Sequence, residues 1–174
     1  QIVPLKIRSL VGLLPLLAVE TIENIVLDAL PIFHQRMKWF LSQRPDYATT
    51  MTCTLNPNHK SKQLLCILTQ ERLLSTLRYM LDEEEFLSPY GIRSLSKYHQ
   101  DHPYTLNLAD QPRCVNYQPG ETSHRSMAGG NSNWRGPIWF PINYLIIEAL
   151  QKYHHYYGES LKVEFPTRSG NWIT

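Results

Sequence analysis

Residues 129–145 (GGNSNWRGPIWFPINYL) hold the side chains with the most distinctive chemistry in this sequence. Trp134 offers a flat apolar ring, and Arg135 beside it offers a rigid fork of hydrogen-bond donors. An aromatic ring against the C–H face of a pyranose, with donors and amides for its hydroxyl groups, is a common way to bind a sugar, and Asn133 could join such a site. The same residues fit a structural role equally well, with the tryptophans in the core and Arg135 capping a helix or pairing with an acid.

Residues 90–96 (YGIRSLS) make a second compact stretch with candidate ligand contacts. Pro89 and Gly91 indicate a turn, and Tyr90 and Arg93 could face a ligand. Taken alone, the pattern favours a helix that ends in a turn. Its functional interpretation therefore depends on the rest of the sequence.

The acidic and histidine residues give no clear catalytic or metal site. Consecutive acids point in different directions, so the run at 82–85 is expected to be solvated, and Glu121 is expected to cap a turn or face solvent. His99 and His102 are three residues apart, but no nearby residue completes a ligand set. No phosphate-binding loop or dinucleotide signature is present either. The sequence predicts neither a metal nor an organic cofactor.

The elements that would carry these residues have mainly helical spacing. Apolar residues recur every three or four positions in four segments, and the most apolar run, at 10–19, fits a further, buried helix. We expect these helices at residues 10–19, 19–30, 31–41, 73–81 and 142–157. Pro31 and Pro141 suit the first turns of two of them, and Gly158 follows the last. No alternating run is flanked by hairpin turns, so no strands are predicted. Long polar loops are expected at 47–62 and 88–137.

Composition limits the class of protein and its partners. The 174 residues are 43% hydrophobic and 18% charged with a net charge of +2, which suits a globular protein and gives no nucleic-acid footprint. The most apolar run is too short to span a membrane. The odd number of cysteines (Cys53, Cys66 and Cys114) argues against a disulfide framework and favours a reducing, cytoplasmic location.

The stretch at 129–145 resembles the signature of glycoside hydrolase family 63, which includes processing α-glucosidases and mannosylglycerate hydrolases. The bacterial, mannosylglycerate-hydrolase-like branch is the nearest resemblance. Further stretches follow in the family's order, so that the resemblance covers nearly the whole chain. They are IRSLVGLLPLLAVETI (7–22), YMLDEEEFLSPYGIRSLSKYHQDHPY (79–104), YQPGE (117–121) and LQKYHHYYGESLKVEFPT (150–167).

The resemblance implies a fold and a reaction. The family fold is an (α/α)6 toroid, so we expect an all-α part of such a toroid with long loops at one end. Family members hydrolyse α-glycosidic bonds with inversion, in which one carboxylic acid protonates the leaving oxygen while a second carboxylate activates water. The expected substrate is a glucoside, a mannoside or a glycosylglycerate.

Site residues transfer from the family only where its motifs match. Trp134 and Arg135 match positions expected to line the sugar subsite, and Tyr90 and Gly91 match the loop at the mouth of the cup. The general acid and base of the family fall upstream and downstream of the matched region. The resemblance therefore implies a partial catalytic domain over residues 1–174, truncated at both ends and inactive alone. The alternative is a non-catalytic carbohydrate-binding or helical scaffold module.

Overall fold

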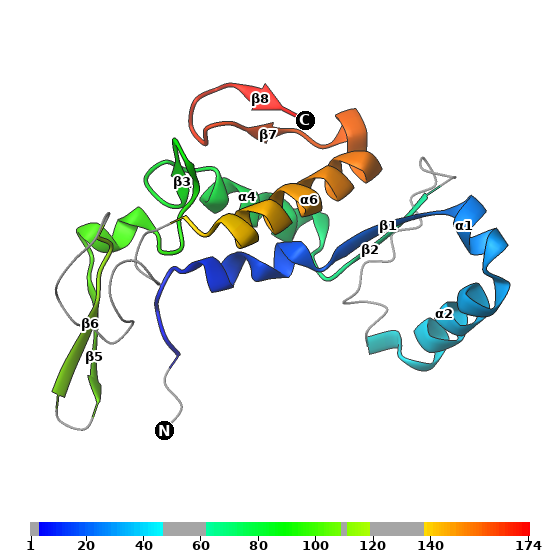
Figure 1. Cartoon of the computed structure of the whole chain (residues 1–174), viewed down its shortest axis with the longest axis horizontal. Helices are drawn as coiled ribbons and strands as arrows, with labels where there is room; N and C mark the ends of the chain where they lie inside the picture. Colours follow the sequence, from blue (N-terminus) through cyan, green and yellow to red (C-terminus); the bar gives the residue numbers. More distant parts are fainter. Residues whose placement is uncertain (1–3, 47–61, 109–110, 119–137) are drawn as a thin grey trace. The chain divides into compact units, whose positions relative to one another are not determined.

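The computed structural model describes residues 4–46, 62–108, 111–118 and 138–174. Helices, 3₁₀-helices (η) and strands alternate along the chain (Figure 1). In chain order they are η1 (Leu10–Leu17), β1 (Val19–Glu23), α1 (Asn24–Ala29), α2 (Pro31–Gln43), β2 (Lys62–Cys66), α4 (Gln70–Met80), β3 (Leu87–Ser88), β4 (Gly91–Ile92), η2 (Lys97–Gln100), β5 (Tyr104–Leu108), β6 (Gln111–Val115), α6 (Phe140–Tyr157), η3 (Gly158–Ser160), β7 (Val163–Glu164) and β8 (Trp172–Ile173).

The expectation of an all-α fragment of a toroid is wrong. Within the described residues the strands form four two-stranded antiparallel sheets, β1–β2, β3–β4, β5–β6 and β7–β8. In β1–β2, Val19 lies opposite Cys66 and Glu23 lies opposite Lys62. The two strands are about 40 residues apart in sequence, so their pairing leaves no local hairpin signal. The helix expected at 19–30 is instead a strand followed by the short helix α1.

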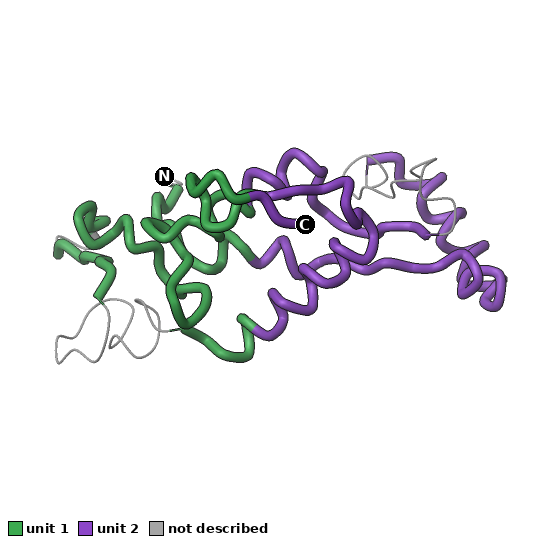
Figure 2. Tube along the Cα trace, turned by 90° about the horizontal axis from the view of Figure 1, so that it is seen from above, with its two compact units in different colours: residues 1–13, 77–143, 164–171 green, residues 14–76, 144–163, 172–174 purple. Residues whose placement is uncertain are grey.

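The chain folds into two compact units, which are coloured separately in Figure 2. Unit 1 contains residues 1–13, 77–143 and 164–171, and unit 2 contains residues 14–76, 144–163 and 172–174. The buried apolar residues of unit 1 are Leu10, Leu13, Leu77, Met80, Leu81, Phe86, Ile92, Leu95 and Val115. Those of unit 2 are Leu16, Val19, Leu27, Leu64, Cys66, Leu68, Leu73, Ile146, Ala149, Tyr153, Tyr156 and Tyr157. Each unit thus has apolar residues of its own shielded from water.

Two of the expected helices bury much of their apolar stripes, although Leu145 in the second is 45% exposed. In α4, Leu73, Leu77 and Met80 are buried, as their spacing predicts. In α6, the buried residues are Ile146, Ala149, Tyr153, Tyr156 and Tyr157. Gly158 follows α6 in the left-handed region, with φ of 51°, as expected for a glycine just after a helix.

The segment expected as a helix at 10–19 forms the 3₁₀-helix η1, with Pro15 inside it. Leu10, Leu13 and Leu16 are buried and Val11 is exposed. Because a 3₁₀-helix has three residues per turn, an interval of three places all three leucines on one face. The three-residue interval between these leucines therefore fits a 3₁₀-helix better than an α-helix.

Helix α2 begins at Pro31 as predicted and ends before Arg44, but none of its residues is buried. Ile32, Phe33, Trp39 and Phe40 are all exposed. None of the helices in the described part of the chain is long and apolar enough to cross a membrane.

Burial in unit 2 perturbs two phenols near the end of α6. Loss of hydration raises the pKa of Tyr153 well above its usual range and raises that of Tyr157 to about 12. Cys66 adds to both shifts. Because the pKa values are raised, the phenols stay neutral in the folded chain at a pH where the unfolded chain begins to ionise them.

We expect this burial to make the fold sensitive to alkali. The unfolded phenol ionises near pH 10, so unfolding releases a proton between pH 10 and 12, and the free energy of unfolding falls as pH rises through that window. Tyr157→Phe should reduce the fall by up to about 2 kcal/mol. Urea denaturation of both proteins from pH 7 to 12 measures this effect. A difference between them that stays constant across the whole range would contradict it.

Candidate functional site

The β3–β4 hairpin of unit 1 presents Tyr90 to solvent. Tyr90 is 87% exposed, the largest exposure among the large apolar and aromatic side chains described. The hydroxyl of Ser88 fixes the turn, because it accepts a hydrogen bond from the Tyr90 N–H at 3.2 Å and donates one to the Gly91 carbonyl at 2.7 Å. An exposed aromatic ring on an ordered turn can contact a ligand at little conformational cost.

Asn143, in the first turn of α6, holds this hairpin by its backbone. Its side-chain oxygen accepts from the Ile92 N–H at 2.7 Å, and its amide nitrogen lies 3.1 Å from the carbonyl oxygens of Ile92 and Trp139. A side-chain amide supplies both a donor and an acceptor, so it can bond to both backbone groups of one residue. Asn143 is not among the predicted site residues, although a polar amide between apolar residues in the first turn of the expected helix is a signal.

Gly91 is required at the point where the hairpin meets α6. Its φ is 132°, and a Cβ atom there would lie 2.8 Å from Oδ1 of Asn143 and 3.1 Å from Cγ2 of Ile138. The backbone angle and the close approach each exclude a side chain. Gly91 therefore acts through the shape of the backbone, while Tyr90 carries the exposed ring.

Arg93 is half-buried and binds the chain itself. Its Nη1 donates to the Glu83 carbonyl at 3.0 Å and also to that of Leu87, while its Nε donates to the Tyr117 hydroxyl at 3.2 Å. Its backbone pairs with Ile138 in an isolated antiparallel bridge. Protein oxygens thus occupy Nη1 and Nε of Arg93, and a ligand contact by this residue stays a prediction.

The acidic run at 82–85 is not simply solvated. Glu85 is 8% exposed, and its two carboxylate oxygens bind the Arg8 guanidinium and the Ser96 hydroxyl. Asp82 pairs with Arg168 at 2.5 Å. The prediction of a solvated run is wrong for Glu85 because four acids in one turn segment point to different sides, and one of them faces inward.

Glu84 matches the prediction better. Its side chain is exposed and pairs with Lys97 at 3.0 Å. The hydrogen bond from Lys97, followed by the charge of that ammonium group, holds the pKa of Glu84 below its usual value. Glu84 therefore lacks the raised pKa that a general acid needs.

His99 is a structural residue of unit 1. It is 2% exposed, and its Nε2 lies 2.9 Å from the backbone nitrogen of Arg8, which can only donate. Nδ1 must then carry the proton, and it lies 3.0 Å from the carbonyl oxygen of His102. Both ring nitrogens of His99 are thus used. Within the described ranges no group of three or more His, Cys, Asp or Glu residues could hold a metal ion.

The structure places only part of the predicted site. Tyr90 and Gly91 lie on the hairpin, which the Arg93 bridge joins to Ile138. Asn133, Trp134, Arg135 and Glu121 lie outside the described residues, and their roles stay predictions. The sugar hypothesis rests mainly on these residues. The structure describes the segments before and after them.

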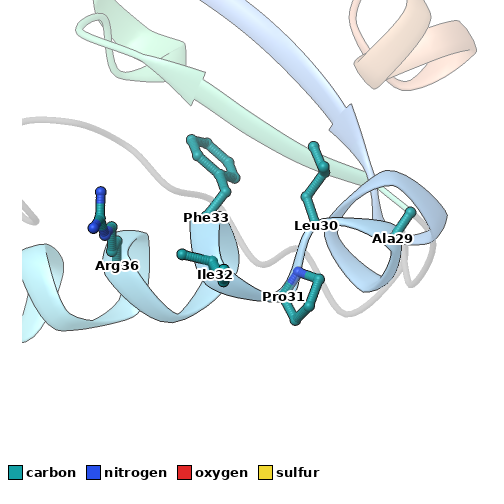
Figure 3. A pocket seen from close by; sticks show the side chains of 6 residues that line it. All are labelled: Ala29, Leu30, Pro31, Ile32, Phe33 and Arg36. Carbon is teal, nitrogen blue, oxygen red and sulfur yellow. The ribbon is translucent and has the colours of Figure 1, made fainter.

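A pocket at the α1–α2 corner of unit 2 is a poor candidate for a sugar site. Figure 3 shows its lining, which comes from two neighbouring turns and carries a single charged group, that of Arg36. The lining residues are Ala29, Leu30, Pro31, Ile32, Phe33 and Arg36. Sugars need several directed hydrogen bonds, and one guanidinium among apolar side chains supplies too few.

Comparison with known proteins identifies relatives for most of the chain. Residues 62–165, more than half of the chain, match the family described as Glycosyl hydrolase family 63 C-terminal domain. The uncharacterized protein YMR196W of Saccharomyces cerevisiae is 48% identical over 172 residues, which are 98% of this chain and 16% of that protein. A probable mannosyl-oligosaccharide glucosidase of Schizosaccharomyces pombe is 39% identical over 79 residues, which are 45% of this chain and 7% of that protein. No solved structure matches.

The contact between Gly91 and Asn143 can be tested by a matched pair of substitutions. Gly91→Ala should lower the free energy of unfolding by more than about 2 kcal/mol, because the new methyl group meets Asn143 at a strained φ. Gly12→Ala has no atom within 4 Å of the new methyl group and should change stability by less than about 1 kcal/mol. Urea denaturation measures both. Equal effects of the two substitutions would show that the close approach is unimportant.

Proposed function

The chain belongs to glycosyl hydrolase family 63, and from this premise we propose that it forms part of the sugar-binding face of an α-glycosidase catalytic domain. The matched stretches cover only 16% and 7% of the length of the two relatives above, so activity is proposed for a whole protein of which such a stretch is a part. Its own contribution is the pair of stretches that the sequence singled out, residues 90–96 and 129–145.

One observation supports this proposal most directly. The hairpin that exposes Tyr90 is fixed to Ile138 and Asn143, which belong to the stretch that contains Trp134 and Arg135. Arg135 is three residues from Ile138 in sequence, and three extended residues span at most about 11 Å. The two stretches with candidate sugar contacts thus have a common anchor, which a plain connector would not need.

We propose that this surface binds the sugar and leaves the chemistry to carboxylates elsewhere. Hydrolysis with inversion needs an acid and a base on opposite faces of the sugar. Asp82, Glu84 and Glu85 are engaged by Arg168, Lys97 and Arg8. The inverting course and a glucoside, mannoside or glycosylglycerate substrate follow from the family resemblance.

The first test concerns Tyr90. If its ring packs against a sugar, Tyr90→Ala should weaken binding about tenfold, equivalent to ~1.4 kcal/mol. The urea midpoint should stay unchanged, because the side chain is exposed. Titration of the 174-residue chain with methyl α-glucoside and methyl α-mannoside, followed by NMR, measures the binding.

Glu83→Ala is the matched control for Tyr90→Ala. Glu83 is an exposed residue of the turn just before β3, and its carbonyl bond to Arg93 does not involve its side chain. The control should bind sugar like the unmodified chain. Binding that is unaffected by Tyr90→Ala would remove Tyr90 from the site, and no binding by the unmodified chain would favour the scaffold alternative.

The second test concerns turnover. We expect the 174-residue chain to hydrolyse none of four substrates, namely aryl α-glucoside, aryl α-mannoside, mannosylglycerate and glucosylglycerate. The reason is that both carboxylates are needed in the same step. Release of aryl alcohol or free sugar by the purified chain is the measurement. Turnover that is abolished by Glu121→Gln would overturn the expectation and make Glu121 catalytic.

A further inference from the structure

Arg93 makes contacts on both sides of the stretch that carries the predicted sugar ligands. Its guanidinium reaches Tyr117, near the end of the described part before that stretch, and its backbone pairs with Ile138, the first described residue after it. Tyr117 and Ile138 are 21 positions apart in the sequence. One residue thus contacts both flanks of the stretch.

We propose that Arg93 is a positioning residue of the proposed sugar site, which sets the distance between Tyr117 and Ile138 and the orientation of the Tyr90 hairpin. The inference rests on the proposed function for its consequence in sugar binding. The positioning itself rests only on contacts within unit 1. An experiment can therefore reject the positioning role and the proposed function independently of each other.

The geometry of the guanidinium supports positioning rather than ligand contact. Nη1 points to the carbonyl oxygens of Glu83 and Leu87, and Nε points to the Tyr117 hydroxyl. These donors point in different directions from one planar group. The guanidinium therefore holds both the segment before the hairpin and the segment after β6. The partners are neutral oxygens, and the guanidinium also lies 5.7 Å from the centre of the Tyr117 ring.

The backbone of Arg93 adds a second constraint. Its N–H donates to the Phe86 carbonyl at 2.8 Å, and the residue before it, Ile92, is held by Asn143. The main chain at 92–93 is therefore fixed on both edges, and the side chain leaves it in a defined direction. A lysine would keep the charge, but a single ammonium cannot reproduce a planar fork of donors, so the main chain at 92–93, and with it the contacts to Ile138 and Asn143, would lose the restraint that the guanidinium gives.

Arg93→Lys is the decisive variant, with Tyr117→Phe as the partner change and Arg113→Ala as control. Arg113 is an exposed arginine on β6 that bonds to Gln111. Amide hydrogen exchange of the full 174-residue chain is the first readout. Exchange at residues 111–118 and 138–143 should accelerate at least tenfold in Arg93→Lys, less in Tyr117→Phe, and not in Arg113→Ala, while residues 146–157 of α6 keep their rates.

Sugar affinity and chemical rescue are the second readout. Binding of methyl α-glucoside should weaken about tenfold in Arg93→Lys, and low-millimolar guanidinium should restore part of the affinity in Arg93→Ala. Unchanged exchange at both flanks would overturn the positioning role, as would a uniform acceleration over the whole chain. Accelerated exchange at the flanks in a chain that binds no sugar would keep the positioning role and reject the proposed function.

Discussion

Backbone groups removed from water must find hydrogen-bond partners, and in unit 1 the loop between α4 and β5 meets this requirement with side chains as well as with other backbone groups. The β3–β4 ladder pairs only two residues on each strand. Asn143 supplies partners for Ile92, the guanidinium of Arg93 binds carbonyls of the segment before the hairpin, and Ser88 bonds across the turn. The position of Tyr90 depends on these contacts, because a two-residue ladder alone is too short to fix a hairpin.

Side-chain groups beside the hairpin are paired as well, among them the buried carboxylate of Glu85. Arg8 and Glu85 are joined from distant parts of the sequence, and Ser96 occupies the other carboxylate oxygen. The Arg8 guanidinium also lies 3.8 Å from the centre of the Tyr98 ring. A carboxylate with both oxygens bonded holds its partners strongly. The loss of one partner would leave a buried charge unpaired. The segment around residue 8 is thereby bound to the loop by polar groups as well as by its leucines.

Sequence periodicity predicted the helices whose contacts are local. Residues 73–81 and 142–157 gave clear stripes, and α4 and α6 follow them. It failed at 19–30, where the stripe continues through β1, because the pairing of β1 with β2 is a long-range contact that a local window cannot contain. It also missed β5, although its residues (YTLNL) alternate between apolar and polar side chains, and β6, which is mostly exposed and does not alternate. The site followed the same rule. The exposed Tyr90 and the turn at Gly91 were predicted from local chemistry, whereas the contacts of Arg93 and Glu85 depend on partners elsewhere in the chain.

The ring of His99 has a consequence for how this region can be observed. With Nε2 accepting from Arg8 and Nδ1 facing the carbonyl of His102, a single neutral tautomer is defined, and the His99 carbonyl also accepts from the Tyr117 N–H at 3.2 Å. One imidazole residue thus joins three separate stretches of chain. Its Nδ1 proton is shielded from solvent by burial, so it should exchange slowly enough to give a resolved signal in the proton spectrum. That single resonance would report whether the segments around Arg8, His102 and Tyr117 are assembled around His99.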